Sequence, residues 1–109
     1  MLTTNEKLRY ELEFTIEAIV EAVGGDGACE KVGYLALSGG SGQRPWVEHR
    51  FWVIVPQHVK GAIVGKDGAN ANRLRELVKT RATVLGNHEP IDVRVISCED
   101  EAPEGVFAA

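Results

Sequence analysis

Apolar residues near the start of the chain recur at intervals of three and four, which is the spacing of one face of an α-helix. The residues in this pattern are Leu8, Leu12, Ile16, Ile19, Val20 and Val23. The glycine-rich segment 24–27 follows directly. Because glycine favours the C-terminal boundary of a helix, the pattern predicts a first helix that ends there.

Two segments rich in β-branched and aromatic residues come next, and they predict two strands. They span residues 31–37 and 48–55. Between them, residues 38–42 read Ser-Gly-Gly-Ser-Gly, which predicts a flexible loop. The simplest arrangement is a hairpin with a long, loose connection.

The second half of the chain predicts further helices and a last strand. Pro56 ends the second strand, and residues 57–64 can form a short helix. Apolar residues then return at helical spacing at Leu74, Leu77, Val78, Ala82 and Leu85. After a break at residues 86–90, apolar and polar residues alternate from Ile91 to Val95, as in a strand.

Residues 81–86 are open to two interpretations. Thr83 and Val84 are β-branched, which is typical of a strand. Helix is favoured because Leu85 lies eleven residues after Leu74 and so returns to the same helical face. The predicted element order is then α-β-β-α-α-β.

Length and composition indicate one soluble domain. The chain has 109 residues, of which 44% are hydrophobic and 26% charged. No apolar run approaches the roughly 18 residues that would cross a membrane, and the N-terminus lacks a secretory signature. We therefore expect a cytoplasmic protein with a folded domain over residues 1–97 and a flexible acidic tail over residues 98–109.

Catalytic and metal chemistry have little support in the sequence. Cys29 and Cys98 lie far apart, and in a reducing compartment we expect free thiols. No Cys/His spacing indicates zinc, and no nucleophile–base pair is visible. The histidines show no arranged partners, which favours ordinary surface or loop positions for His49, His58 and His88. The expectation is a protein without catalysis, metal or cofactor.

Charge is unevenly distributed along the chain. The net charge is −4, which speaks against a nucleic-acid partner. Residues 57–81, however, contain six basic and two acidic residues, a net charge of +4. For a phosphate-binding surface, the sign of the local charge matters more than the net charge of the whole chain. This block is where a nucleic acid would bind, with strong salt dependence.

A G-x-x-G motif, Gly65-Lys66-Asp67-Gly68, lies inside the basic block. An apolar run precedes it and a basic helical pattern follows it. Because glycine has no Cβ, a phosphate can approach the main chain at such a turn. Free N–H groups at the start of the following helix also favour an anion.

With its flanks, this motif resembles a KH domain over residues 48–96. The residues that carry the resemblance are Val55-Pro56, Gly61, Ile63-Val64, the turn at 65–68 and Leu74-Arg75. The whole chain looks similar to small stand-alone bacterial KH proteins of the type II arrangement. The resemblance implies an α+β fold in which helices cover one face of a three-stranded mixed sheet. Were residues 81–86 a strand, the C-terminal half would instead look like type I.

The resemblance also implies a groove that holds about four single-stranded nucleotides. The predicted RNA-contacting residues are Gly65, Lys66, Asp67, Gly68, Asn70, Arg73, Arg75, Val59, Ile63 and Val64. Lys66 supplies a mobile positive charge, and Asn70 is a candidate for hydrogen bonding to a base edge. Asp67 opposes binding, since a carboxylate beside phosphates lowers affinity.

Partners follow from the same resemblance. Single-stranded RNA is the expected ligand, with single-stranded DNA not distinguished from it. The alternative is a KH-like protein-interaction or dimerisation module with a degenerate groove. Exposed aromatic residues on the first helix, Tyr10 and Phe14, fit a protein interface. Similar KH proteins form homodimers or heterodimers with other RNA-binding proteins, so either assembly is an expectation here.

Overall fold

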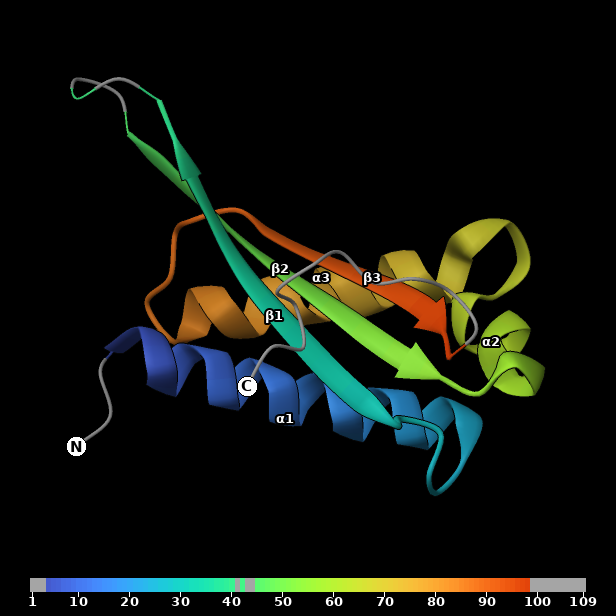
Figure 1. Ribbon diagram of the computed structural model, residues 1–109. Coiled ribbons are helices and arrows are strands. Elements are labelled where there is room, and N and C mark those ends of the chain that lie inside the picture. Colours follow the sequence, from blue (N-terminus) through green and yellow to red (C-terminus); the bar gives the residue numbers. More distant parts are fainter. Residues whose placement is uncertain (1–3, 41, 43–44, 99–109) are drawn as a thin grey trace.

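The chain folds in the predicted order α-β-β-α-α-β (Figure 1). The computed structural model describes residues 4–40, 42 and 45–98, without the side chains of residues 4 and 5. The elements are α1 (Thr4–Gly24), β1 (Lys31–Gly39), β2 (Trp46–Val55), α2 (Gln57–Val64), the short 3-10 turn η1 (Lys66–Gly68), α3 (Ala69–Val84) and β3 (Ile91–Ser97).

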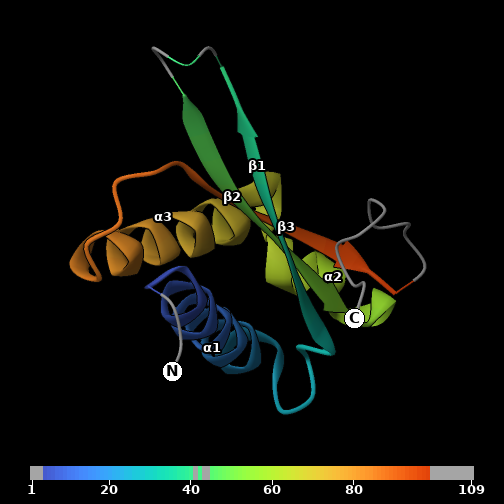
Figure 2. The same cartoon turned by 60° about the vertical axis from the view of Figure 1, so that its left-hand side comes forward.

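The three strands form a mixed sheet in the order β1-β2-β3. The central strand, β2, runs antiparallel to β1 and parallel to β3. The hairpin is longer than predicted, because pairing continues to Gly39 opposite Trp46. A Cβ on Gly39 would come within 2.6 Å of the Trp46 ring, so the indole packs on bare backbone there. The extended hairpin projects beyond the body of the molecule (Figures 1 and 2).

The α-helices α1, α2 and α3 lie on one face of the sheet (Figure 2). Alternate residues of β2 point toward them, namely Phe51, Val53 and Val55, and each is at most 1% exposed. They join a single core with the buried stripe of α1, which consists of Leu8, Leu12, Ile16 and Val20. Burial of this shared apolar surface holds the helical layer to the sheet.

Residues 81–84 form the last turn of α3 and residues 85–86 the turn that ends it, so the segment is helical rather than a strand, as expected. The helix continues to Val84, and Gly86 has a φ of 90° that ends it. The order and the mixed sheet are those of the type II KH fold. Leu77 and Leu85, however, are 47% and 38% exposed. They flank the buried stripe of α3, which is formed by Ala71, Leu74, Val78 and Ala82.

His49 is not a surface residue, contrary to the expectation from sequence. Its side chain is buried between two partners brought in from distant parts of the chain. Tyr34 Oη lies 2.7 Å from Nδ1, and Glu89 Oε1 lies 2.9 Å from Nε2. A neutral ring that donates from Nε2 and accepts at Nδ1 satisfies both contacts. Burial raises the pKa of Tyr34, which keeps its hydroxyl protonated as the donor.

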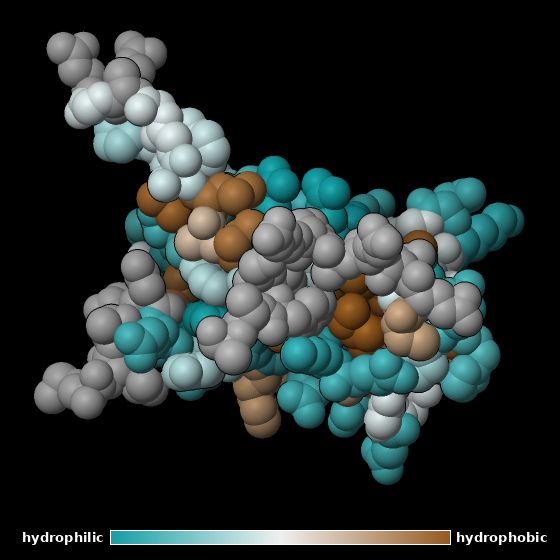
Figure 3. Space-filling model, in the orientation of Figure 1, coloured by the Kyte–Doolittle hydropathy of each residue, from teal (hydrophilic) through white to brown (hydrophobic). Residues whose placement is uncertain are grey.

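The other face of the sheet carries alternate residues of the strands, among them Leu35, Trp52 and Ile54. Figure 3 shows brown areas on this side, at the base of the projecting hairpin and toward the right. Trp52 is only 4% exposed, so its ring is packed and is not available to stack on a base. Within the described ranges, no helix is long and apolar enough to cross a membrane. Most of the predicted acidic tail, residues 99–109, lies outside the described part of the chain.

We predict that Tyr34→Phe lowers the free energy of unfolding by about 1–2 kcal/mol, because it leaves Nδ1 of the buried His49 without its partner. Urea denaturation measures the change. Tyr10→Phe is the matched control, since the Tyr10 side chain is 50% exposed and its loss of a hydroxyl should change stability by less than about 0.5 kcal/mol. Equal effects of the two substitutions would contradict the role given to Tyr34.

Candidate nucleic-acid interface

The Gly65–Gly68 turn joins α2 to α3 at one end of the molecule (Figure 1). Its main chain lies in left-handed or otherwise positive-φ regions at Gly65 (78°), Asp67 (55°) and Gly68 (77°). The Gly65 N–H donates to Gly61 O at 2.9 Å, and the Gly68 N–H donates to Gly65 O at 3.2 Å. These bonds close the end of α2 and leave Lys66 and Asp67 exposed at the tip.

Gly65 is required by close packing as well as by φ. A Cβ there would lie 2.8 Å from Cγ and 2.9 Å from the main-chain nitrogen of Asn70. Asn70 in turn donates from Nδ2 to Ala62 O at 2.9 Å, which ties the first turn of α3 to the last carbonyls of α2. The amide nitrogen that was expected to contact a base is therefore used to hold the turn together.

The start of α3 has no side-chain cap. Gly68 occupies the N-cap position and has no side chain to offer; the Ala69 N–H donates to Lys66 O, and the N–H groups of the next residues follow it. These groups and the helix dipole favour an anion at this end. The uncapped helix start and the bare backbone of the turn therefore face the same site.

Two of the predicted cations remain available beside the turn. Lys66 and Arg73 are exposed, and neither side chain makes an ion pair or hydrogen bond within residues 4–40, 42 and 45–98. Lys66 sits at the tip of the turn, and Arg73 follows it in the first two turns of α3. Both can reach a bound polyanion without giving up another contact.

Arg75 has a different environment. Its Nε donates to Val93 O at 2.8 Å, and its Nη1 donates to Asn72 Oδ1 at 2.7 Å. Asp92 Oδ1 also lies 3.6 Å from Nε. Because β3 is an edge strand, this arginine satisfies a main-chain carbonyl that no further strand covers. The structure thus directs Arg75 to the sheet edge rather than to the turn.

The three apolar residues predicted to line a groove are not equivalent. Ile63 is 3% exposed and belongs to the core, where a Cβ on Gly24 would come within 2.8 Å of its Cδ1. It fixes the end of α1 against α2 instead of lining the surface. Val59 and Val64 are half-buried, and Val59 packs against the same core. Only these two are placed to offer apolar surface next to the turn.

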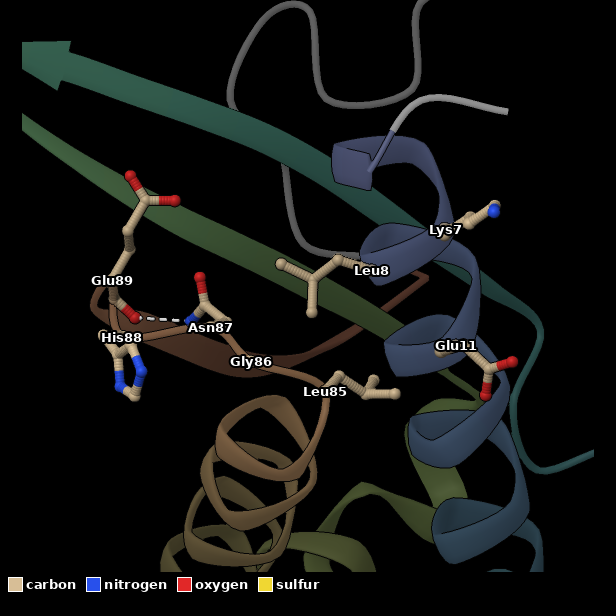
Figure 4. Close-up of a pocket in the computed structure, with 8 residues that line it drawn as sticks. All are labelled: Lys7, Leu8, Glu11, Leu85, Gly86, Asn87, His88 and Glu89. Carbon is tan, nitrogen blue, oxygen red and sulfur yellow. Dashed lines mark hydrogen bonds between the residues drawn. The ribbon is translucent and has the colours of Figure 1, made fainter. Parts of the chain in front are cut away.

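Hollows of about 530 and 540 Å³ lie away from the turn, beside the N-terminal half of α1. Figure 4 shows the first of them, between α1 and the loop that joins α3 to β3. Leu85 lies between these elements with its side chain directed toward α1. Tyr10 and Phe14, which fit a protein interface from sequence, line the second hollow, whereas the first hollow was not predicted. The relevant signal was Leu85 itself, an apolar residue at the end of a helix whose buried stripe already ends at Ala82.

The cysteines are free thiols, Cys29 partly buried and Cys98 exposed. Burial, with the nearby Glu17 and Glu21 carboxylates, raises the pKa of Cys29 to about 11. Its thiol is therefore protonated at neutral pH and a poor nucleophile. Among the described residues, no group of His, Cys, Asp and Glu side chains is arranged to hold a metal ion.

Comparison with known proteins supports the fold. No protein-family model matches the chain, and no curated protein matches it. One similar solved structure is Era in complex with MgGDPNP and nucleotides 1506–1542 of 16S ribosomal RNA, with a TM-score of 0.54 and 14% identity. The match covers 84% of this chain but only 32% of the Era chain. It shows a shared fold, which agrees with the KH-like element order.

A second solved structure, a putative redox protein from Lactobacillus casei, is more distant. It has a TM-score of 0.46 and 17% identity, and the match covers 87% of this chain and 66% of that chain. A similarity at this level carries no argument about the present chain.

We predict that Gly65→Ala distorts the turn and lowers the free energy of unfolding by about 1–3 kcal/mol, because it adds strain at positive φ and a clash with Asn70. Gly61→Ala is the matched control inside α2, where a Cβ meets nothing within 4 Å. It should stabilise the protein by about 0.5–1 kcal/mol, since alanine is the better helix former. Urea denaturation compares the two, and a neutral Gly65→Ala would contradict the packing argument.

Proposed function

We propose that this chain is a non-catalytic module that binds single-stranded RNA through the Gly65–Gly68 turn. The observation that supports it most is the joining of two features at one exposed site: glycine backbone at positive φ and an uncapped helix start. A phosphate can approach the main chain there, and the first N–H groups of α3 can donate to it. Lys66 and Arg73 add positive charge without losing an existing partner.

We assign three roles to the predicted contact residues. In this proposal, Lys66, Gly68 and Arg73 contact the sugar–phosphate backbone, because a Cβ on Gly68 would meet nothing within 4 Å, whereas Gly65 packs against Asn70 and shapes the turn. Of the other polar residues, Asn70 holds the turn through Ala62 O, whereas Arg75 is bonded to Val93 O at the sheet edge. Val59 and Val64 offer the apolar surface on which a base or sugar can rest.

The comparison with Era supports RNA as the class of ligand. The structure of Era contains a segment of 16S ribosomal RNA, and the match in fold covers 84% of the present chain. The fold alone does not carry a function, so the chemistry of the turn has to supply the argument. The proposed cations contact the sugar–phosphate backbone, and no set of side chains in the proposed site is arranged to read base edges. Such a site favours binding with little sequence preference.

Asp67 limits the affinity of this site. It stands between the two glycines with φ 55° and an exposed side chain. Its carboxylate lies next to the position proposed for a phosphate, where it opposes Lys66. With a net charge of −4 for the whole chain, we expect binding that depends strongly on salt.

We predict that Lys66→Asp weakens binding of a labelled random single-stranded RNA by at least about tenfold at low salt, because it removes a backbone cation and adds an anion. Raising salt from about 50 mM to about 200 mM should weaken wild-type binding roughly tenfold, if two or three phosphates are contacted. Fluorescence anisotropy measures both changes.

Lys79→Asp is the matched control for this experiment. Lys79 is 51% exposed on α3, away from the turn, and its ion pair with Glu76 is long at 3.9 Å. We expect this variant to lose less than about threefold in affinity, since it lies outside the proposed contacts. Equal losses for both variants would refute a site at the turn. No anisotropy change at low salt would refute RNA binding and favour a protein-interaction module.

We further predict that Asp67→Asn tightens RNA binding by about two- to fivefold at low salt. Asparagine tolerates the left-handed conformation as aspartate does, so the turn keeps its shape while the opposing charge is lost. The gain should shrink as salt rises. An unchanged or weaker affinity, in a variant with wild-type urea stability, would show that no phosphate lies near this residue.

A further inference from the structure

The outward face of α1 carries a seam of side chains at alternating spacings of three and four residues. They are Lys7, Tyr10, Phe14, Glu17 and Glu21. This spacing places them in one line along the helix, on the side away from the buried stripe. Tyr10 and Phe14 at its centre are 50% and 72% exposed. Two large aromatic side chains in mid-helix contribute little to the core of the single chain.

A hollow lies beside the aromatic centre of this seam. It measures about 540 Å³ and is lined by Lys7, Tyr10, Glu11, Phe14 and Leu85. It shares Lys7, Glu11 and Leu85 with the neighbouring hollow drawn in Figure 4. An apolar side chain from outside could therefore enter between α1 and the end of α3.

The charges along the seam indicate which kind of partner fits this surface. Its N-terminal end carries Lys7, which has no ion pair within the described ranges, and its C-terminal end carries Glu17 and Glu21. Two such seams in antiparallel orientation bring opposite charges together at both ends, whereas a parallel pair brings like charges together. The surface is thus complementary to a second copy of itself, as a two-fold interface requires.

We propose that two copies of this chain associate through α1 in antiparallel orientation, with the two-fold axis between Tyr10 and Phe14. Tyr10 of each copy then packs on Phe14 of the other, and Lys7 faces Glu17. The Phe14 ring of the second copy enters the hollow beside Leu85. The seam residues fall alternately on two heptad positions. In this register each residue at one position contacts a residue at the other position of the second helix, as in antiparallel knobs-into-holes packing.

The neighbouring charges are compatible with this register. Glu11 and Glu13 flank the seam and would approach each other across the axis. Each already has a partner in its own chain: Glu11 Oε2 lies 3.4 Å from Arg81, and Glu13 Oε1 lies 2.8 Å from Arg9. Their charges are compensated before the two copies meet.

The association is independent of RNA binding. The seam centres on residues 10–14, whereas α2 and the turn lie at the C-terminal end of α1, where Ile63 packs beneath Gly24. An antiparallel pair places the two turns at opposite ends of the dimer, so both stay open. Loss of one activity without the other is therefore observable.

Sedimentation velocity over a concentration series tests the aromatic centre. We expect a monomer–dimer equilibrium in the wild type and a dissociation constant raised at least about tenfold by Phe14→Glu. Val84→Glu is the matched control, because Val84 is 70% exposed on α3 and lines neither hollow. A wild type that stays monomeric, or equal effects of the two substitutions, would overturn the proposal.

Charge reversal tests the orientation. Lys7→Glu and Glu17→Lys should each raise the dissociation constant about tenfold, because two symmetric pairs become repulsive. The double variant Lys7→Glu/Glu17→Lys restores opposite charges across the axis, so its dissociation constant should return to within about threefold of wild type. Additive weakening in the double variant would rule out the antiparallel register.

Discussion

The parallel pairing of β2 with β3 is the constraint on which the rest of the molecule depends. Two adjacent parallel strands cannot be joined by a tight turn, so the chain must cross over the sheet between them. Here the crossover is made by α2 and α3. The Gly65–Gly68 turn is the corner of this connection, which explains why it lies exposed at the end of the sheet. The proposed binding site is therefore a consequence of the topology.

Local signals predicted the elements well, because each boundary had its own chemical cause. Pro56 and Gly65 bracket α2, and the structure places that helix at residues 57–64, as expected. The length of the hairpin was underestimated. The glycines at its loop end predict a loop, whereas the strand pairing there depends on Trp46 packing over Gly39. Spacing identified α3 but could not show that Leu77 remains outside the buried stripe.

The roles of polar residues were less predictable, because their partners are distant in sequence. His49 meets Tyr34 and Glu89, which lie 15 and 40 residues away. Arg75 bonds to Val93 across 18 residues, at a strand edge that exists only once the sheet is formed. The motif could locate the turn from sequence alone, but only the packing shows which side chains hold it and which are free to bind.

Amide chemical-shift mapping of the labelled protein, during titration with a short single-stranded RNA, tests whether the Gly65–Gly68 turn is the binding site. We expect the largest shifts at residues 65–73, the turn and the first part of α3, with smaller ones at Val59 and Val64. Shifts concentrated on the outward face of α1 or on the open face of the sheet would contradict it. So would an unchanged spectrum at low salt.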